Sequence, residues 1–92
     1  MCMQGVTRKA GPLPGKIVAL FGGVHGNERV GVEALRWAAA TIEPECGTIY
    51  FVEANPAAIE KNLRMLKKNL NRCLLEENQG TAPEDVRARE LM

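Results

Sequence analysis

Two short apolar runs, separated by an amphipathic segment, dominate the pattern of the chain. Residues 17–21 (Ile-Val-Ala-Leu-Phe) are continuously apolar and end at two glycines, which is typical of a parallel strand buried on both faces. Residues 48–52 (Thr-Ile-Tyr-Phe-Val) are rich in β-branched and aromatic side chains and predict a second strand. The order strand, helix, strand predicts a βαβ unit. The intervening residues recur at the spacing of one buried helical stripe, namely Gly31, Ala34, Leu35, Ala38, Ala39 and Ile42.

The segments outside this unit are shorter and richer in turn residues. Residues 1–16 carry glycine or proline at five positions and predict an irregular lead-in. After the second strand, Asn55 can cap a short helix that has Pro56 in its first turn. Residues 76–83 are polar and predict a loop, and Pro83 with the two acids behind it predicts the start of a last helix.

The βαβ unit is too small to bury two strands of this kind. One long helix and two short ones cannot cover both faces of a sheet, and such strands normally lie centrally in larger sheets. Ninety-two residues suffice for one small domain. We therefore expect the α/β fold class, with residues 1–92 forming a single N-terminal portion of a larger domain whose sheet is incomplete in this chain.

The composition argues against several classes of partner. The formal net charge is +1, with 12 basic and 11 acidic residues, so nothing favours a nucleic acid or a membrane surface. The apolar runs are far shorter than a membrane span, and no secretory leader precedes them. The cysteines are odd in number and widely spaced, which predicts a reducing cytoplasm rather than a disulfide-forming compartment; they are Cys2, Cys46 and Cys73.

The turn between the first strand and the long helix carries the most distinctive chemistry. Residues 22–28 read Gly-Gly-Val-His-Gly-Asn-Glu and contain His25, the only histidine of the chain, three positions before Glu28. Imidazole nitrogen and carboxylate oxygen are two of the usual protein ligands of a catalytic zinc. The competing interpretation is a tight turn in which Asn27 caps the helix and Glu28 complements its dipole. Spacing alone leaves both interpretations open.

Other polar residues are expected near this turn, because ligands of open α/β folds bind beyond the C-terminal ends of the strands. Arg64, Asn71 and Arg72 are the candidates, since a guanidinium suits a carboxylate or a carbonyl oxygen. The competing interpretation is a solvated basic segment. A dinucleotide site is disfavoured, because the glycine spacing differs from Gly-x-Gly-x-x-Gly and Glu28 would repel a pyrophosphate. No Walker-type Gly-Lys-Ser/Thr sequence is present.

Taken in order, four motifs of the chain resemble those of a known family. They are residues 22–28, Asn55-Pro56, Arg64 and residues 69–72 (Asn-Leu-Asn-Arg). From about Lys16 to Leu91 the chain is similar to the succinylglutamate desuccinylase/aspartoacylase family, which are zinc-dependent deacylases with a zinc-carboxypeptidase-like fold. The resemblance implies that this chain is the N-terminal part of such a catalytic domain.

The resemblance also implies a role for each candidate residue. His25 and Glu28 would be ligands of one zinc ion. Arg64 would help to polarise the scissile carbonyl, and Asn71 and Arg72 would contact a carboxylate of the substrate. The implied reaction is hydrolysis of an amide, or an ester, of a small N-acyl amino acid-like substrate by metal-activated water.

The departures from the family pattern limit this expectation. Asn69 stands where the family commonly has aspartate, and Cys73-Leu74 stand where an aromatic residue often follows. The family's third zinc ligand is a later histidine and its general base a still later glutamate, and neither has a counterpart here. We therefore expect the 92-residue chain to be inactive alone. The alternative is a non-catalytic remnant, or a binding or assembly piece that associates with itself or with a complementing chain.

Overall fold

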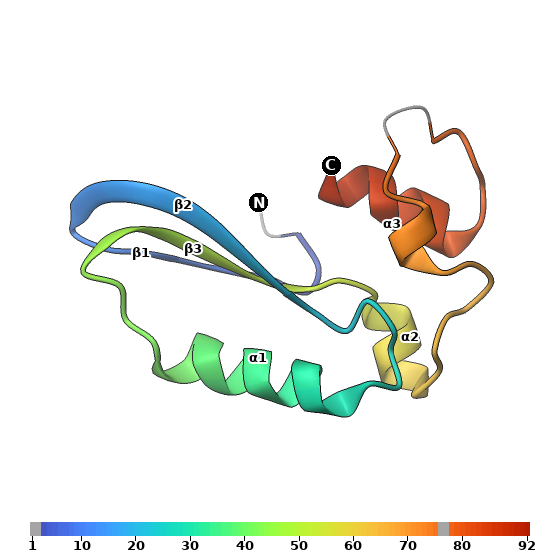
Figure 1. Cartoon of the computed structure of the whole chain (residues 1–92), viewed down its shortest axis with the longest axis horizontal. Coiled ribbons are helices and arrows are strands. Elements are labelled where there is room, and N and C mark those ends of the chain that lie inside the picture. Colours follow the sequence, from blue (N-terminus) through green and yellow to red (C-terminus); the bar gives the residue numbers. More distant parts are fainter. Residues whose placement is uncertain (1–2, 76–77) are drawn as a thin grey trace.

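A three-stranded sheet with helices on one face and at one end makes up the structure, a computed structural model that describes residues 3–75 and 78–92 (Figure 1). Helix α1 runs along one face of the sheet, whereas α2 and α3 lie beyond the end at which β2 and β3 finish (Figure 1). The strands are β1 (Val6–Ala10), β2 (Leu13–Gly22) and β3 (Cys46–Glu53), and the helices are α1 (Arg29–Thr41), α2 (Pro56–Lys61), the 3-10 helix η1 (Leu70–Arg72) and α3 (Pro83–Leu91).

The predicted βαβ unit is confirmed. Strands β2 and β3 are parallel, with Leu20 opposite Phe51 and Gly22 opposite Glu53, and α1 connects them. Because the two strands are parallel, they finish at the same end of the sheet. The turn that carries His25 follows β2 at this end.

The prediction of an irregular lead-in is wrong, because β1 forms there and β2 begins as early as Leu13. Strand β1 pairs antiparallel with β3, with Val6 opposite Val52. It is a short edge strand that carries Arg8 and Lys9 and remains largely exposed. Such a strand is held by its backbone pairing and needs no apolar run, which is why the apolar pattern did not reveal it.

The expected burial of residues 17–21 on both faces is also wrong for this chain. The sheet order is β1-β3-β2, so β2 is an edge strand. Ile17 is 74% exposed and Phe21 54% exposed, and only Gly22 of β2 is buried. Strand β2 thus has the apolar composition of a central strand, although it lies at the open edge of the sheet. This is the incomplete α/β sheet that the sequence indicates.

Helix α1 buries a narrower stripe than predicted. Val32 and Leu35 are its buried residues, whereas Gly31, Ala34 and Ile42 are exposed. A sheet of three strands offers little surface for a helix to cover, and α1 packs mainly against β2 and β3. The small residues on α1 therefore remain largely without a packing partner among the described residues.

The two shorter α-helices begin where their capping residues predict. Asn55 is the N-cap of α2, where its side chain accepts a hydrogen bond from the backbone of Ala58, and Pro56 follows in the first turn. Helix α3 begins at Pro83 as predicted. Of the predicted loop at residues 76–83, residues 78–82 contain no helix or strand, whereas residues 76 and 77 lie outside the described residues.

One cluster of buried residues lies between α3, η1 and the residue after β3. It consists of Ala54, Leu70, Cys73 and Ala88, and the half-buried Val24 and Leu91 pack against it. Cys73 is a buried free thiol whose pKa is raised by burial, Cys46 is an exposed free thiol, and Cys2 lies outside the described residues. In the described parts of the chain, no helix is both long and apolar enough to cross a membrane.

A buried arginine joins α3 to the rest of the fold. Arg87 donates hydrogen bonds to the carbonyl oxygens of Ala54 (2.7 Å), Gln4 (2.8 Å) and Glu53 (3.0 Å). Burial lowers the pKa of its guanidinium, although the nearby Glu90 opposes this shift. One side chain thus links the last helix, the end of β3 and the segment before β1.

Candidate functional site

The loops that follow β2 and β3 lie side by side at the end of the sheet. The Ala54 amide donates to the carbonyl of Gly22 (2.8 Å), and the Asn55 amide donates to that of Gly23 (3.2 Å). Gly23 has a positive φ of 72°, a conformation that favours glycine. These contacts bring the two loops together where the sequence predicts a shared pocket.

Gly26 is the position at which this turn touches its neighbours most closely. Its amide donates to the carbonyl of Arg64 (3.2 Å), and its Cα faces the backbone of Ala58 and Ile59. A Cβ at this position would overlap those backbone atoms. The residue after the histidine must therefore be glycine for the turn to sit against α2.

His25 and Glu28 meet within the turn. His25 Nδ1 lies 3.1 Å from Glu28 Oε1, and their side chains are 19% and 60% exposed. Glu28 occupies the N-cap position of α1, yet its side chain makes no capping hydrogen bond, and Asn27 precedes the cap. Glu28 therefore lies where its charge complements the helix dipole, but its carboxylate faces the imidazole rather than a backbone amide of α1.

The other nitrogen of the ring faces Asn69. His25 Nε2 lies 3.1 Å from Asn69 Oδ1, which also accepts a hydrogen bond from the Asn71 amide (3.1 Å). Because Oδ1 accepts in both contacts, the proton of the neutral ring belongs on Nε2. The lone pair of Nδ1 then points at Glu28 Oε1. A metal ion placed between these two atoms could accept electron pairs from both.

The donor pair fits part of a zinc site. Two ligands of a tetrahedral zinc, each at ~2.1 Å from the metal, are roughly 3.4 Å apart, which is close to the 3.1 Å between His25 Nδ1 and Glu28 Oε1. A catalytic zinc normally has three protein ligands. Within residues 3–75 and 78–92, no group of three histidine, cysteine, aspartate or glutamate side chains could hold a metal. The described residues therefore bring two potential metal-ligating atoms together here, His25 Nδ1 and Glu28 Oε1.

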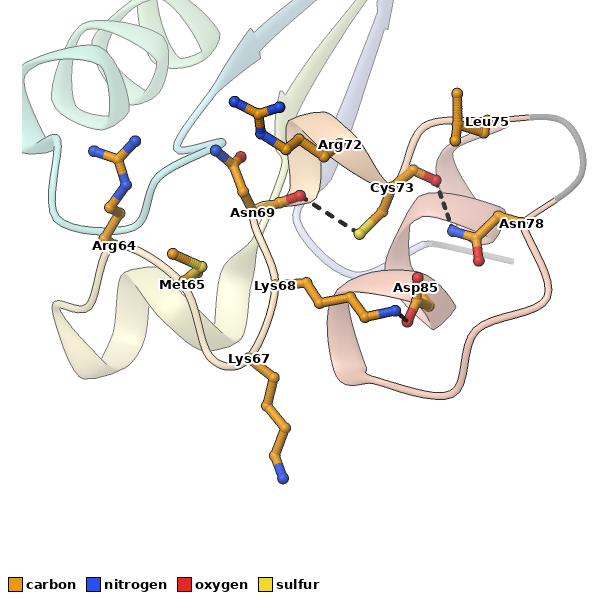
Figure 2. Close-up of a pocket in the computed structure, with 10 residues that line it drawn as sticks. All are labelled: Arg64, Met65, Lys67, Lys68, Asn69, Arg72, Cys73, Leu75, Asn78 and Asp85. Atoms are coloured by element: carbon orange, nitrogen blue, oxygen red, sulfur yellow. Dashed lines mark hydrogen bonds and ion pairs between the residues drawn. The ribbon is translucent and has the colours of Figure 1, made fainter.

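A basic pocket of about 880 Å³ lies next to the His25 turn and includes Arg64, Asn69 and Arg72 among its lining residues (Figure 2). Asn69 joins the two features, because it lines the pocket and contacts His25. Arg64 and Arg72 thus share a pocket with the residue that contacts His25. Asn71 is exposed, and its contact here is the backbone amide that holds Asn69.

A buried carboxylate behind the pocket escaped sequence analysis. Glu84, in the first turn of α3, is fully buried. Burial alone would raise the pKa of its carboxyl, but four hydrogen bonds outweigh burial and hold the pKa below its ordinary value. They come to Oε2 from the Leu66 amide (2.7 Å) and the Asn55 side chain (3.1 Å), and to Oε1 from the amides of Lys67 and Lys68 (3.0 Å each).

The neighbouring acid holds the same loop. Asp85 Oδ2 lies 2.7 Å from Lys68 Nζ, and this hydrogen bond lowers the pKa of Asp85 and raises that of Lys68. An acid in the first turn of a helix is explained by the helix dipole alone. No local pattern therefore indicates that Glu84 and Asp85 reach a loop some 17 positions earlier.

Known proteins resemble the chain in both sequence and fold. Residues 14–92 match the succinylglutamate desuccinylase/aspartoacylase catalytic domain. A probable aspartoacylase from a Nostoc species is 36% identical, over 80% of this chain and 28% of its own length.

Solved structures give the same picture. A succinylglutamate desuccinylase/aspartoacylase from Rhodobacter sphaeroides is 29% identical, with a TM-score of 0.71 over 94% of this chain and 27% of its own. An ectoine utilization protein from Ruegeria pomeroyi is 31% identical, with a TM-score of 0.68 over 89% of this chain and 26% of its own. A succinylglutamate desuccinylase from Vibrio parahaemolyticus, 21% identical with a TM-score of 0.67, shares the fold over 96% of this chain and 32% of its own.

The chain thus spans about a quarter to a third of the length of the relatives it matches. The matched region contains the His25 turn, Arg64 and residues 69–72. Because the family match covers most of this sequence, the chain belongs to the succinylglutamate desuccinylase/aspartoacylase family.

Proposed function

We propose that the chain supplies the first part of a zinc-dependent deacylase site. The observation that carries this proposal is the convergence of His25 Nδ1 and Glu28 Oε1, 3.1 Å apart, while His25 Nε2 contacts Asn69 Oδ1. A bound zinc would supply an activated water for hydrolysis of an amide, or an ester, of a small N-acyl amino acid-like substrate. A cytoplasmic location fits this proposal.

The remaining residues have binding and orienting roles in this proposal. Asn69 holds the imidazole by its Nε2 proton, as second ligand-shell groups do in metal sites. Arg64 and Arg72 place positive charge in the neighbouring pocket. Arg64 would polarise the scissile carbonyl, and Arg72 with Asn71 would hold a carboxylate of the substrate.

A zinc titration of the 92-residue chain tests this proposal. We expect His25→Ala and Glu28→Ala each to weaken zinc binding at least about ten-fold, because a single remaining ligand holds the ion poorly. Titration calorimetry measures the affinities. The zinc-loaded wild-type chain is expected not to hydrolyse N-acyl amino acids, since it offers two protein ligands among its described residues.

Glu33→Ala is the matched control, because Glu33 is an exposed acid on α1. It is expected to bind zinc like the wild type. Equal affinities in all four proteins would show that His25 and Glu28 are not ligands. Robust zinc-dependent turnover by the chain alone would contradict the expectation that its catalytic site is incomplete.

A second candidate function is that of a non-catalytic assembly piece. The observation that favours it is the open edge of β2, where Leu13, Ile17 and Phe21 are exposed. Edges of this kind pair readily with further strands, from a second copy or from a complementing chain. If this role holds, sedimentation equilibrium of the purified chain will give a mass above that of one copy, and a monomer at all accessible concentrations will count against it.

A further inference from the structure

Burial of the Glu84 carboxylate costs folding free energy, which matters in so small a fold. Moving an ionised group out of water is costly unless hydrogen bonds replace its hydration. Here they do, because both oxygens accept two hydrogen bonds each. All four donors are neutral N–H groups, since the Lys68 ammonium pairs with Asp85 instead. Glu84 thus acts as a hydrogen-bond acceptor for backbone rather than as half of an ion pair.

Three of the donors are consecutive amides of one loop. Leu66, Lys67 and Lys68 lie between α2 and η1, in a segment without helix or strand. Such a segment has no backbone ladder of its own to fix its path. The Glu84 carboxylate takes the place of that ladder.

Both ends of this loop touch the His25 turn. At one end, the carbonyl of Arg64 accepts from the Gly26 amide (3.2 Å). At the other, Asn69 Oδ1 contacts His25 Nε2 (3.1 Å). The middle of the loop is thus held by Glu84 of α3, and both of its ends contact the turn that carries the imidazole. Figure 2 shows Arg64 and Asn69 on the stretch of ribbon that passes Lys67 and Lys68.

From these contacts we propose that Glu84 is a positioning residue, which fixes the loop of residues 64–69 so that Asn69 and Arg64 meet the His25 turn. Its effect on hydrolysis rests on the proposed function. Its effect on the position of His25 does not, because the contacts that define it need no metal.

The chemistry of the four donors explains why glutamate is required at this position. A glutamine has the same shape, but its amide nitrogen would face N–H donors that need an acceptor. An aspartate keeps both oxygens but is one methylene shorter. Glu84→Gln should therefore release the loop, and Glu84→Asp should retain part of the hydrogen bonding.

The single histidine makes the test direct, because imidazole nitrogen signals in an NMR spectrum of the chain arise from His25 alone. In zinc-free Glu84→Gln we expect the Nε2 proton of His25 to lose its protection from exchange. The amides of residues 66–68 should exchange at least about ten-fold faster. Glu84→Asp should give intermediate values. Glu33→Gln, which changes an exposed acid on α1, should match the wild type.

The possible results distinguish the positioning role of Glu84 from the proposed function. A folded Glu84→Gln variant with wild-type His25 signals and wild-type exchange at residues 66–68 would overturn the positioning role. So would loop amides that exchange at random-coil rates in the wild type, a measurement that does not depend on any variant folding. Altered His25 signals in Glu84→Gln support the role even if the wild type binds no zinc. In that case the proposed function fails and the positioning role stands.

Discussion

Replacing Arg87 with methionine is expected to lower the free energy of unfolding by at least about 3 kcal/mol. The substitution keeps most of the side-chain length but removes hydrogen bonds to three backbone carbonyls. Bonds from a charged donor contribute about 1.5–3 kcal/mol each, and a buried acceptor left without a partner costs about 1–3 kcal/mol. A domain of this size has a total stability on the order of 5–14 kcal/mol, so a large share would be lost. Urea unfolding followed by circular dichroism measures the change.

Arg89 provides the matched control for this prediction. It lies on the same helix and also donates to a carbonyl, that of Gly80 at 2.7 Å, but it is exposed. Exposed contacts of this kind contribute little, so Arg89→Met should have a small effect. Equal losses in the two variants would show that burial of Arg87 is not the cause.

Gly26→Ala is expected to displace the His25 turn and to destabilise the chain by about 1–3 kcal/mol, as overpacking does. The added Cβ would overlap the backbone of Ala58 and Ile59, and a backbone does not yield as a flexible side chain does. Moving the turn would also separate His25 from Asn69. Thermal unfolding gives the stability, and the His25 imidazole signals give the displacement.

Gly31→Ala is the control, because nothing lies within 4 Å of a Cβ at this exposed position of α1. Glycine in a helix interior costs about 0.5–1 kcal/mol relative to alanine, and Gly31, in the first turn of α1, should cost no more than this. This variant should therefore be slightly more stable than the wild type and should leave the His25 signals unchanged. A loss of stability similar to that of Gly26→Ala would point to a general intolerance of alanine rather than to the contact at α2.

Much of the fold was predictable because its signals are local. The helix starts at Pro56 and Pro83 follow from residues that suit the first turn. The strand at residues 48–52 follows from its composition, and the parallel pairing follows from the long helix between the two strands. The contact between His25 and Glu28 is also local, since the two residues are three positions apart.

The features that escaped prediction depend on contacts between distant residues. Strand β1 forms because it pairs with β3, and its own composition does not indicate a strand. In the sequence Asn69 is only a departure from the family pattern, because its contact with His25 joins residues 44 positions apart. Glu84 and Arg87 are charged residues of a short helix, and only the fold shows that both are buried.

The position of α3 has a consequence for the order in which the chain can fold during synthesis. Strands β2 and β3 and helix α1 emerge early, but the loop that orients His25 is held by Glu84, and Arg87 bonds to Gln4, 83 positions away. Contacts between such distant residues form late and slow the folding of a domain. The metal-ligand candidates are thus translated long before their surroundings can become ordered. A nascent chain would acquire its site only after α3 has left the ribosome.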